Sequence, residues 1–414
     1  MALDIVVRGL SPLSRIWAAG LEADTAESLA LLYPSLSRGA TLDAAFRSLK
    51  RRSADYDVLE GRWRNAFFGA GDDLAKFHRD RGRAARRLMA ARIGFAAVPG
   101  WWRAPPVRYE VPDAASVEAS HGMRLDARHV PHDFAAPEMS QSLVQQDKRT
   151  YWLRFPSLLG DTAWARVTEP ASQPCTAALV SLHGLAVEPE MLGGLPDSYA
   201  PLLNAGIRII APEAPFHGRR RLPGWSGGEP VVGRAPLGML DLLRAWSAEA
   251  GHLIAWARGH GSQRVGLAGI SMGALTAQWL VGSAGDWPAA QRPDTALLVT
   301  TSGDMLDVSL RGGLARGLGL DRALAEAGRT ETALARWRSL LEPGDRPALP
   351  PEDILMVLGD ADVVTPYDSG AALARRWQLP PGNVHIRPRG HFSQALAMFG
   401  EADLLRDLTR RLVT

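Results

Sequence analysis

The spacing of hydrophobic and polar positions changes near residue 149. Up to about residue 95, apolar residues recur every three or four positions in a stretch rich in Ala, Leu and Arg, as at Leu42, Phe46 and Leu49. This period places apolar side chains on one face of a helix. Residues 96–148 are rich in proline and follow no clear period, which predicts an irregular connector rather than a helix or a central strand. Residues 1–148 are therefore expected to form an N-terminal helical extension and a connector.

From residue 149 onward, short apolar runs alternate with helical patterns. The runs with strand character are TYWLRFPS, DTAWARVTEP, TAALVSLHG, IRIIAPEAP, RVGLAGIS, TALLVTTSG, DILMVLGD and NVHIRPRG. Strands that alternate with helices predict an α/β fold, in which a mostly parallel sheet is covered by helices on both faces. We expect this domain to span residues 149–414. The stretch at about 304–350 is longer than a simple crossover and predicts an inserted cap of small helices.

Cysteine content and hydropathy argue against a disulfide-rich protein, a thiolate metal protein and a membrane-spanning protein. The single cysteine, Cys175, excludes an internal disulfide framework and a thiolate metal cluster, which is typical of a reducing compartment. No apolar run reaches the length of a membrane span, and the N-terminus lacks the pattern of a signal peptide. We expect a cytoplasmic protein without stable membrane insertion.

Basic residues gather between Lys50 and Arg92, although the formal net charge of the whole chain is only +3. Acidic residues such as Asp55 and Asp72 interrupt this stretch, and no nucleic-acid-binding motif accompanies it. We therefore interpret it as the solvated faces of long helices and expect no nucleic-acid partner. Docking to a partner, to a membrane or to a second copy of the chain stays open as the alternative role of the N-terminal region.

Ser271 occupies the centre of a Gly-x-Ser-x-Gly pattern at residues 269–273. A buried-strand pattern, RVGLAGI, precedes it, and a helix pattern, MGALTAQWLV, follows it. Such a sharp strand-turn-helix connection needs glycines beside the serine, and the helix start supplies N–H groups for a developing oxyanion. Ser271 is therefore predicted to be a catalytic nucleophile.

A nucleophilic serine needs a base and an acid that orients the base, which follow it in the order acid, then His. After the strand DILMVLG come Asp360 and Asp362, and we favour Asp362 because it lies past the glycine turn. His391 follows the last strand and is predicted to be the base. His385 alternates within that strand and is predicted to be a sheet residue.

The loop after the early strand TAALVSL is expected to lie beside the sharp strand-turn-helix connection that carries Ser271. In this arrangement the backbone amides of Leu185 and Met272 are the predicted oxyanion donors. His183 precedes this loop, and we expect it to hydrogen-bond the loop in place or to contact substrate. A second catalytic base is not needed there.

Three arginines stand in the segment HGRRRLPG. Loops at the carboxyl ends of strands line the site in open α/β sheets, so Arg219, Arg220 and Arg221 are candidates to pair with a carboxylate or phosphate of the substrate. The alternative is that they pair with acids of the protein, such as Glu213 or Glu229.

These motifs resemble the α/β-hydrolase superfamily over roughly residues 150–414, where SLHG, GISMGA, GDADVVTP and GHFS occur in the expected order. Within it, PEAPFHGRRRLPG, RVGLAGISMGALTAQWLV and RGHFSQALAMFG are similar to the group that contains alpha/beta hydrolase domain-containing protein 18 and its bacterial relatives. The resemblance implies serine hydrolase chemistry on an ester-like bond, with a lipid acyl ester as one candidate substrate.

The predicted reaction is hydrolysis of a carboxylic ester through an acyl-enzyme, with no metal or organic cofactor. The same triad also serves thioesterases, peptidases, acyltransferases and carbon–carbon bond hydrolases. An alternative from another class is a non-catalytic binding protein on a hydrolase scaffold. The complete set of Ser271, Asp362 and His391 favours an enzyme, because binding alone has no chemical need for all three.

Overall fold

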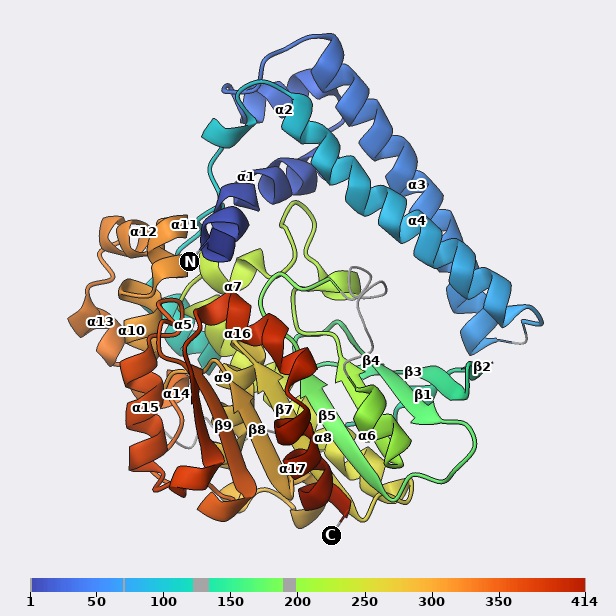
Figure 1. Ribbon diagram of the computed structural model, residues 1–414. Helices are drawn as coiled ribbons and strands as arrows, with labels where there is room; N and C mark the ends of the chain where they lie inside the picture. The colour runs from blue at the N-terminus through green and yellow to red at the C-terminus, as the bar shows by residue number, and fades with distance from the viewer. Residues whose placement is uncertain (1, 70, 122–133, 189–198, 414) are drawn as a thin grey trace.

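A computed structural model describes the chain except residues 1, 70, 122–133, 189–198 and 414 (Figure 1). Its centre is a ten-stranded sheet with the order β1-β3-β4-β6-β5-β7-β8-β9-β10, and β2 pairs with β3. The strands from β6 to β10 run parallel, whereas β1 to β4 pair in antiparallel fashion and β4 pairs antiparallel with β6. The expected fold class, a mostly parallel sheet between helices, is confirmed.

The strands from β3 to β10 coincide with the apolar runs of the sequence, whereas β1 and β2 precede them. The strands are β1 (Glu138–Met139), β2 (Leu143–Gln145), β3 (Lys148–Pro156), β4 (Thr162–Pro170), β5 (Ala177–Leu182), β6 (Ile207–Pro212), β7 (Arg264–Ile270), β8 (Thr295–Val299), β9 (Ile354–Gly359) and β10 (Val384–Arg387).

Helices cover both faces of the sheet (Figure 1). One face carries α6 (Ala200–Asn204) and α17 (Ala402–Val413), and the other carries α8 (Leu237–Gly259), α9 (Met272–Ser283) and α15 (Tyr367–Arg376). Successive strand residues alternate between these layers. In β9, for example, Val357 joins the cluster that contains α17, and Met356 joins the cluster that contains α8. Burial on both faces explains why these strands read as continuous apolar runs.

Residues 304–350, between β8 and β9, fold into short helices that lie beside the carboxyl end of the sheet. They are α10 (Met305–Leu310), α11 (Gly313–Leu318), α12 (Leu320–Glu326), α13 (Glu331–Ala335) and α14 (Arg338–Leu341). Asp304 and Thr330 cap α10 and α13 by accepting a backbone N–H of the first turn. The Trp279 indole of α9 donates to the Leu340 carbonyl over 2.8 Å and ties this cap to the sheet layer.

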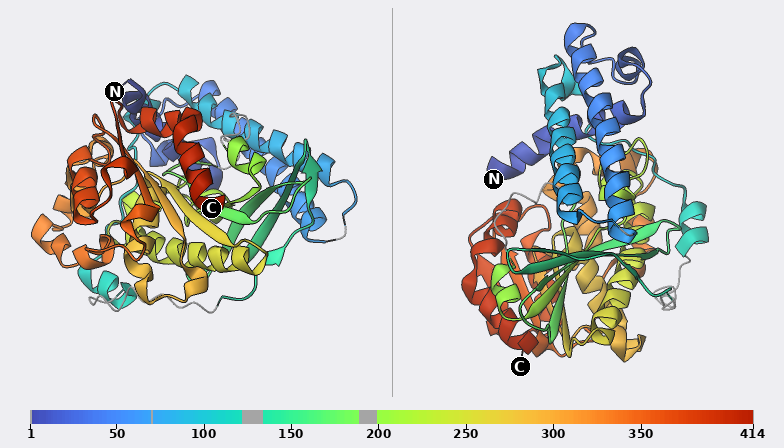
Figure 2. Two further views of the ribbon diagram at one scale, coloured as in Figure 1. Left: turned by 60° about the horizontal axis from the view of Figure 1, so that its bottom comes forward. Right: turned by 90° about the vertical axis from the view of Figure 1, so that its right-hand side faces the viewer.

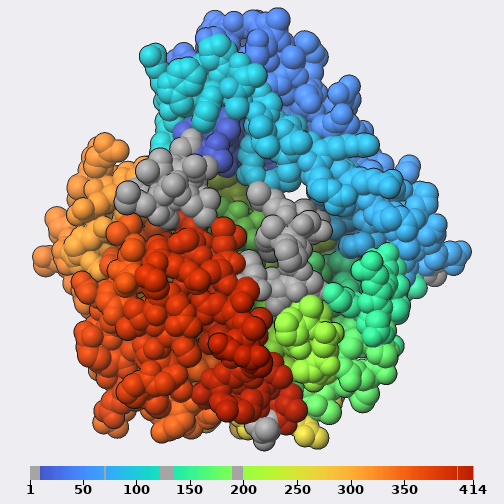
Figure 3. Space-filling view, viewed as in Figure 1, coloured from blue at the N-terminus to red at the C-terminus, as the bar shows by residue number. Residues whose placement is uncertain are grey.

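The N-terminal region forms a separate helical layer with its own hydrophobic cluster. It consists of α1 (Ala2–Glu22), α2 (Ala26–Leu32), α3 (Ala40–Phe68) and α4 (Leu74–Gly94). The two long helices α3 and α4 pair as a hairpin, and α1 lies against both α11 of the cap and α16 (His391–Ala397). Seen from the side, the hairpin starts at the sheet with the end of α3 and the beginning of α4 and rises away from the sheet towards α1 and α2 (Figure 2). In the space-filling view it forms one end of the molecule (Figure 3).

The free end of this hairpin rests on the antiparallel edge of the sheet. Trp63 and Phe67 of α3 pack against Trp152 of β3 and Trp164 of β4 in one buried cluster. The ring centroids of Trp63 and Trp152 lie 4.8 Å apart in an edge-to-face arrangement, which aromatic pairs favour. The extension therefore packs on the rest of the chain at two places, against α11 and α16 through α1 and against β3 and β4 through the hairpin.

The connector was expected to hold neither a helix nor a central strand, and the helix is the difference. It contains the helix α5 (Ala114–His121) and, near its end, the short strands β1 and β2. Asp113 starts α5 by accepting the Ser116 N–H over 2.7 Å. The sheet thus begins at Glu138, before the predicted boundary at residue 149. Residues 122–133 of the connector lie outside the described residues.

No helix in the described part of the chain is both long enough and apolar enough to span a membrane.

Candidate active site

Three side chains that are far apart in the sequence form one chain of hydrogen bonds at the carboxyl edge of the sheet. Ser271 Oγ lies 2.8 Å from His391 Nε2, and His391 Nδ1 lies 2.8 Å from Asp362 Oδ2. Ser271 follows β7, Asp362 follows β9, and His391 is the first residue of α16 after β10. The three residues thus come from strand ends, as the sequence predicted.

Ser271 stands in a backbone conformation that side chains rarely adopt, with φ 55° and ψ −120°. The flanking glycines show why the turn can be this sharp. A Cβ at residue 273 would lie 2.2 Å from the Leu182 carbonyl oxygen, and one at residue 269 would lie 2.2 Å from the Gly273 carbonyl oxygen. The backbone therefore leaves no room for side chains there, and the strain it holds at Ser271 is typical of a nucleophile elbow.

Asp362 is 4% exposed and is held by its own loop. Its Oδ1 accepts the backbone N–H groups of Val364 and Thr365 over 2.8 and 3.0 Å. The Thr365 hydroxyl donates to Oδ2 over 2.9 Å and also lies 3.2 Å from His391 Nδ1. Both carboxylate oxygens are thus fixed, and Oδ2 faces the imidazole. Thr365 was not predicted, although its position three residues after Asp362 suits a hydroxyl that bonds its own loop.

The other carboxylate and the other histidine of this region lie elsewhere. Asp360 is exposed at the end of β9, where its backbone N–H donates to Arg387. His385 lies inside β10, opposite Val357 of β9. The structure therefore brings Asp362 and His391, rather than Asp360 and His385, to Ser271.

The loop after β5 passes directly beside the elbow. A Cβ on Gly184 would lie 3.6 Å from the Ser271 Cβ. Leu185 of this loop and Met272 line the same cavity as Ser271. Met272 is the first residue of α9, and the first N–H groups of a helix have no partner within the helix. The two residues predicted to be oxyanion donors thus line the same cavity as Ser271, and their role stays a prediction.

His183 does not line the cavity, and the structure gives both of its ring nitrogens backbone partners. Its Nε2 accepts the Ala214 N–H over 3.1 Å, and its Nδ1 donates to the Gly184 carbonyl over 2.9 Å. Burial lowers the pKa of His183 to about 4, so the ring is neutral at pH 7. The expectation that it holds the loop matches this geometry, and the expected contact with substrate does not.

A second histidine, His217, was missed from the sequence. It is 0% exposed, its Nε2 accepts the Ala186 N–H over 3.1 Å, and its Nδ1 donates to the Pro215 carbonyl over 2.8 Å. Burial, and after it the neighbouring His183, lower the pKa of His217 to about 3. Its position in PFHGRRR gives no sign of this contact, because Ala186 stands 31 residues earlier.

Arg219 and Arg220 both pair with acids of the protein, which favours the alternative to a substrate role. Arg219 pairs with Glu213, the alternative kept open by the sequence, and with Glu60 of α3 over 2.9 Å. Arg220 is 4% exposed and pairs with Asp161 over 2.8 Å and Glu249 over 2.7 Å.

The third arginine, Arg221, donates to the Trp225 carbonyl over 3.1 Å, and its guanidinium lies over the Trp17 ring. None of the three arginines is among the described residues that line the cavity. A substrate role for any of the three stays a prediction.

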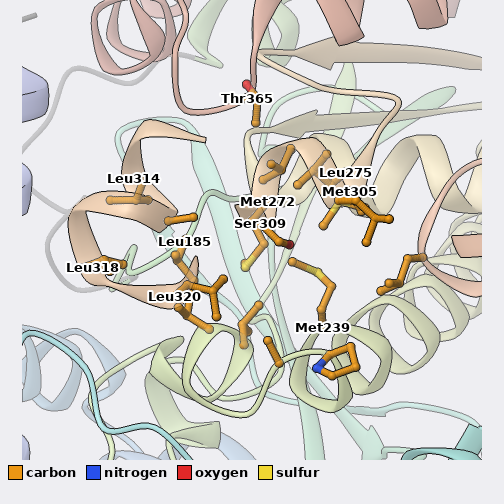
Figure 4. A pocket seen from close by; sticks show the side chains of 18 of the residues that line it. Leu185, Met239, Met272, Leu275, Met305, Ser309, Leu314, Leu318, Leu320 and Thr365 are labelled. Atoms are coloured by element: carbon orange, nitrogen blue, oxygen red, sulfur yellow. The ribbon is translucent and has the colours of Figure 1, made fainter. Parts of the chain in front are cut away.

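A cavity of about 100 Å³ opens at Ser271 beneath the cap (Figure 4). Its described lining holds no charged side chain. The lining comes from the loops after β5 and β9, from the region of α7 (Glu229–Gly233) and α8, from α9, and above all from the cap. Besides Ser271 it consists of Leu185, Val231, Val232, Ala235, Pro236, Met239, Met272, Leu275, Met305, Leu306, Val308, Ser309, Leu314, Ala315, Leu318, Leu320, Leu324, Leu334, Leu341, Val364 and Thr365. Among the described residues, no group of three or more His, Cys, Asp or Glu side chains could hold a metal ion.

Comparison with known proteins adds to this picture. The model of the family described as alpha/beta hydrolase domain containing 18 matches residues 198–304, a segment that includes β6, α8, β7 and the elbow. No curated protein sequence matches the chain.

Several solved structures are similar in fold. A cold-adapted esterase from an Arctic intertidal metagenomic library, bound to PEG, is 18% identical with a TM-score of 0.42, covering 66% of this chain and 97% of its own. Acetyl xylan esterase 1 from Thermoanaerobacterium sp. JW/SL YS485 is 16% identical with a TM-score of 0.48, covering 74% and 97%. Brefeldin A esterase, described as a bacterial homologue of human hormone sensitive lipase, is 18% identical with a TM-score of 0.41, covering 73% and 88%.

The strand order and the sharp strand-turn-helix connection at Ser271 give the chain an α/β-hydrolase fold. Its resemblance to alpha/beta hydrolase domain containing 18 is confirmed over residues 198–304.

Proposed function

We propose that this protein hydrolyses carboxylic esters of apolar acyl groups through an acyl-enzyme on Ser271. The observation that carries the proposal is the Ser271–His391–Asp362 chain, with 2.8 Å at both links, whose serine lines an apolar cavity. Both links lie within the range in which a nucleophile, its base and an orienting acid work together. A protein that only binds ligands has no need for this order of groups or for a strained serine.

In the proposed reaction, Ser271 Oγ attacks the ester carbonyl carbon while His391 Nε2 takes the hydroxyl proton. Asp362 keeps the other imidazole nitrogen protonated and stabilises the imidazolium that forms. The backbone N–H groups of Met272 and Leu185 bind the oxyanion. His391 then protonates the leaving alkoxide, and a water activated by the same nitrogen hydrolyses the acyl-enzyme.

The cavity lining favours an uncharged aliphatic acyl group. A carboxylate or ammonium group buried there would find no opposite charge among the described lining residues, and burial of an unpaired charge is costly. The apolar side chains from the cap and from α8 instead suit hydrocarbon. A lipid acyl ester is therefore the favoured substrate class.

A thioester, an amide or a carbon–carbon bond would use the same triad, and an acyltransferase would release the acyl group to another acceptor. Product analysis with an added alcohol or amine separates transfer from hydrolysis. We favour esters over amides because the oxygen of an ester leaves more readily than the nitrogen of an amide when His391 donates its proton and an alcohol is released.

The test is intact mass spectrometry after treatment with a fluorophosphonate, which phosphonylates activated serines whatever their natural substrate is. We expect one adduct on the wild type and none on Ser271→Ala. A panel of p-nitrophenyl esters from acetate to decanoate then measures the acyl preference. A well-folded wild type that gains no adduct and cleaves none of the esters would overturn the proposal and favour a binding protein.

A further inference from the structure

The segment 213–229 runs from the end of β6 to the first residue of α7 and packs against the loop after β5. It contributes no proposed catalytic group. We call this segment the brace loop, and residues 183–187 the oxyanion loop. His183 of the oxyanion loop accepts the N–H of Ala214 in the brace loop, and His217 of the brace loop accepts the N–H of Ala186 in the oxyanion loop, each over 3.1 Å. A backbone amide only donates, so Nε2 of each ring is the acceptor and Nδ1 carries the proton.

The bond from His217 reaches the residue next to a proposed oxyanion donor. Ala186 follows Leu185 and has a φ of 59°, in the left-handed region that non-glycine residues seldom adopt. The two loops also pack closely at Gly228, where a Cβ would lie 2.3 Å from His217 Nε2 and 2.8 Å from Leu185 Cδ1. The turn that presents the Leu185 amide therefore depends on the brace loop.

The N-terminal extension holds the brace loop through one buried ion cluster. Arg219 of the brace loop pairs with Glu60 of α3, and Arg81 of α4 pairs with the same carboxylate. The guanidinium of Arg219 lies 4.9 Å from the ring centroids of Trp63 and Trp164. Burial alone would raise the pKa of Glu60, but Arg219 and Arg81 together lower it to about 2. The pair is therefore charged at neutral pH.

A second tie joins the other end of the brace loop to the extension. Glu229 is 6% exposed and accepts the N–H groups of Arg108 and Ser226, each over 2.7 Å. Arg15 of α1 approaches the same carboxylate over 3.5 Å and also donates to the Gly224 carbonyl. The brace loop is thus bound by α3 at Arg219 and by α1 at Gly224 and Glu229.

We propose that His183 and His217 are positioning residues that hold the Leu185 amide at the nucleophile, and that the N-terminal extension braces them through Glu60 and Glu229. This inference rests on the proposed function, because it assigns the two histidines to its oxyanion hole. The extension acts within its own chain as part of the catalytic framework.

The first test is the kinetics of His217→Phe, which keeps a ring but removes the acceptor for the Ala186 N–H. Loss of one oxyanion donor costs about 100- to 1000-fold in kcat, so a displaced donor is expected to cost about 10- to 100-fold with little change in KM. His217→Gln, whose amide oxygen can accept the same N–H, is expected to recover part of kcat. His252→Gln is the control, since this histidine packs against Phe134 and Phe155, away from both loops.

The second test leaves the loops unmutated. Glu60→Gln in the full chain is expected to lower kcat about 3- to 10-fold and to speed amide hydrogen exchange in a peptide spanning residues 183–188. Glu138→Gln is the matched control, because it breaks an exposed pair with Arg154 on the same edge of the sheet. The kcat and the hydrogen exchange of Glu60→Gln test the role of the extension even if His217→Phe fails to fold.

The outcomes separate the two proposals. A wild type that is neither labelled nor active removes the proposed function, and the catalytic role of the brace with it. An active wild type whose folded His217→Phe keeps its kcat overturns the role of the histidines. Unchanged exchange and unchanged kcat in Glu60→Gln overturn the role of the extension.

Discussion

His183 and His217 each accept a hydrogen bond from the loop that carries the other histidine. Their ring centroids lie 5.1 Å apart, with His217 fully buried and His183 partly buried. Two imidazolium cations at this distance would repel each other. In addition, a protonated Nε2 could no longer accept the backbone N–H that faces it. The contact therefore exists only with both imidazoles neutral, which makes it sensitive to acid.

We predict that the free energy of unfolding falls as the pH drops below about 6.5, the ordinary histidine pKa. Burial lowers the folded pKa to about 4 for His183 and about 3 for His217, so below pH 6.5 the unfolded chain binds more protons than the folded one. The stabilisation is complete above pH 6.5 and is lost as the pH falls towards these values. Between pH 6.5 and pH 4.5, each histidine accounts for at most about 3 kcal/mol of this loss. Urea denaturation from pH 7.5 to pH 4.5 measures the loss.

Comparison of the wild type with His217→Gln isolates this effect. Burial, with Asp304 next in effect, raises the pKa of Glu342 to about 7, so protonation of Glu342 stabilises the fold as the pH falls and masks part of the loss. That contribution is common to both proteins and cancels in their difference. The variant is expected to lose less stability between pH 6.5 and pH 4.5. Parallel curves for the two proteins would contradict the prediction.

The acid side of the triad gives a second prediction. Asp362→Asn can no longer fix the imidazole tautomer that accepts the Ser271 proton, so we expect kcat to fall about 10⁴-fold. Thr365→Val removes one hydroxyl from Asp362 and leaves both backbone N–H bonds, so a fall of about 3- to 10-fold is expected. Ester hydrolysis at pH 7.5 measures both, and Asp360→Asn is the control because Asp360 is exposed outside the triad. A larger loss in Asp360→Asn than in Asp362→Asn would reassign the acid.

The triad positions could be predicted because each one depends on local order along the chain. Ser271, Asp362 and His391 follow apolar strands, and parallel strands deliver their carboxyl ends to one edge. Their catalytic roles stay predictions. His217 carries no such local signal, because its partner Ala186 becomes visible only when β5 and β6 lie side by side.

Arg220 gives a third prediction, on stability. Its guanidinium pairs with Glu249 and Asp161, and the side chains of Arg220 and Glu249 are each 1% exposed. Arg220→Met leaves Glu249 buried without its cation, so we expect the free energy of unfolding to fall by about 3–5 kcal/mol. The double variant Arg220→Met/Glu249→Gln should lose less, since it removes the stranded charge. Urea denaturation compares the two, and a double variant less stable than the single one would contradict the explanation.

The arginines also show what a sequence pattern leaves undetermined. A run of three arginines in a loop at a strand end suits a substrate anion, and it suits acids of the protein equally well. One of the two acids that pair with Arg219 is Glu60 of α3, which lies 159 residues earlier in the sequence. The way the N-terminal hairpin packs on the sheet decides between the two, and this packing depends on Trp63, Trp152 and Trp164 together rather than on any one segment.

The cap gives a fourth prediction, on acyl-chain length. Leu318 of α11 lines the cavity, so Leu318→Trp is expected to fill part of it (Figure 4). The value of kcat/KM for a p-nitrophenyl octanoate should then fall at least about 10-fold, while that for the acetate changes less than about 3-fold, because one methylene in an apolar pocket contributes about 1–3 kcal/mol. Leu158→Trp, at an exposed leucine outside the cavity, controls for the added indole. An equal loss for both esters would indicate general damage to the cap. An unchanged ratio would mean that the acyl chain binds elsewhere.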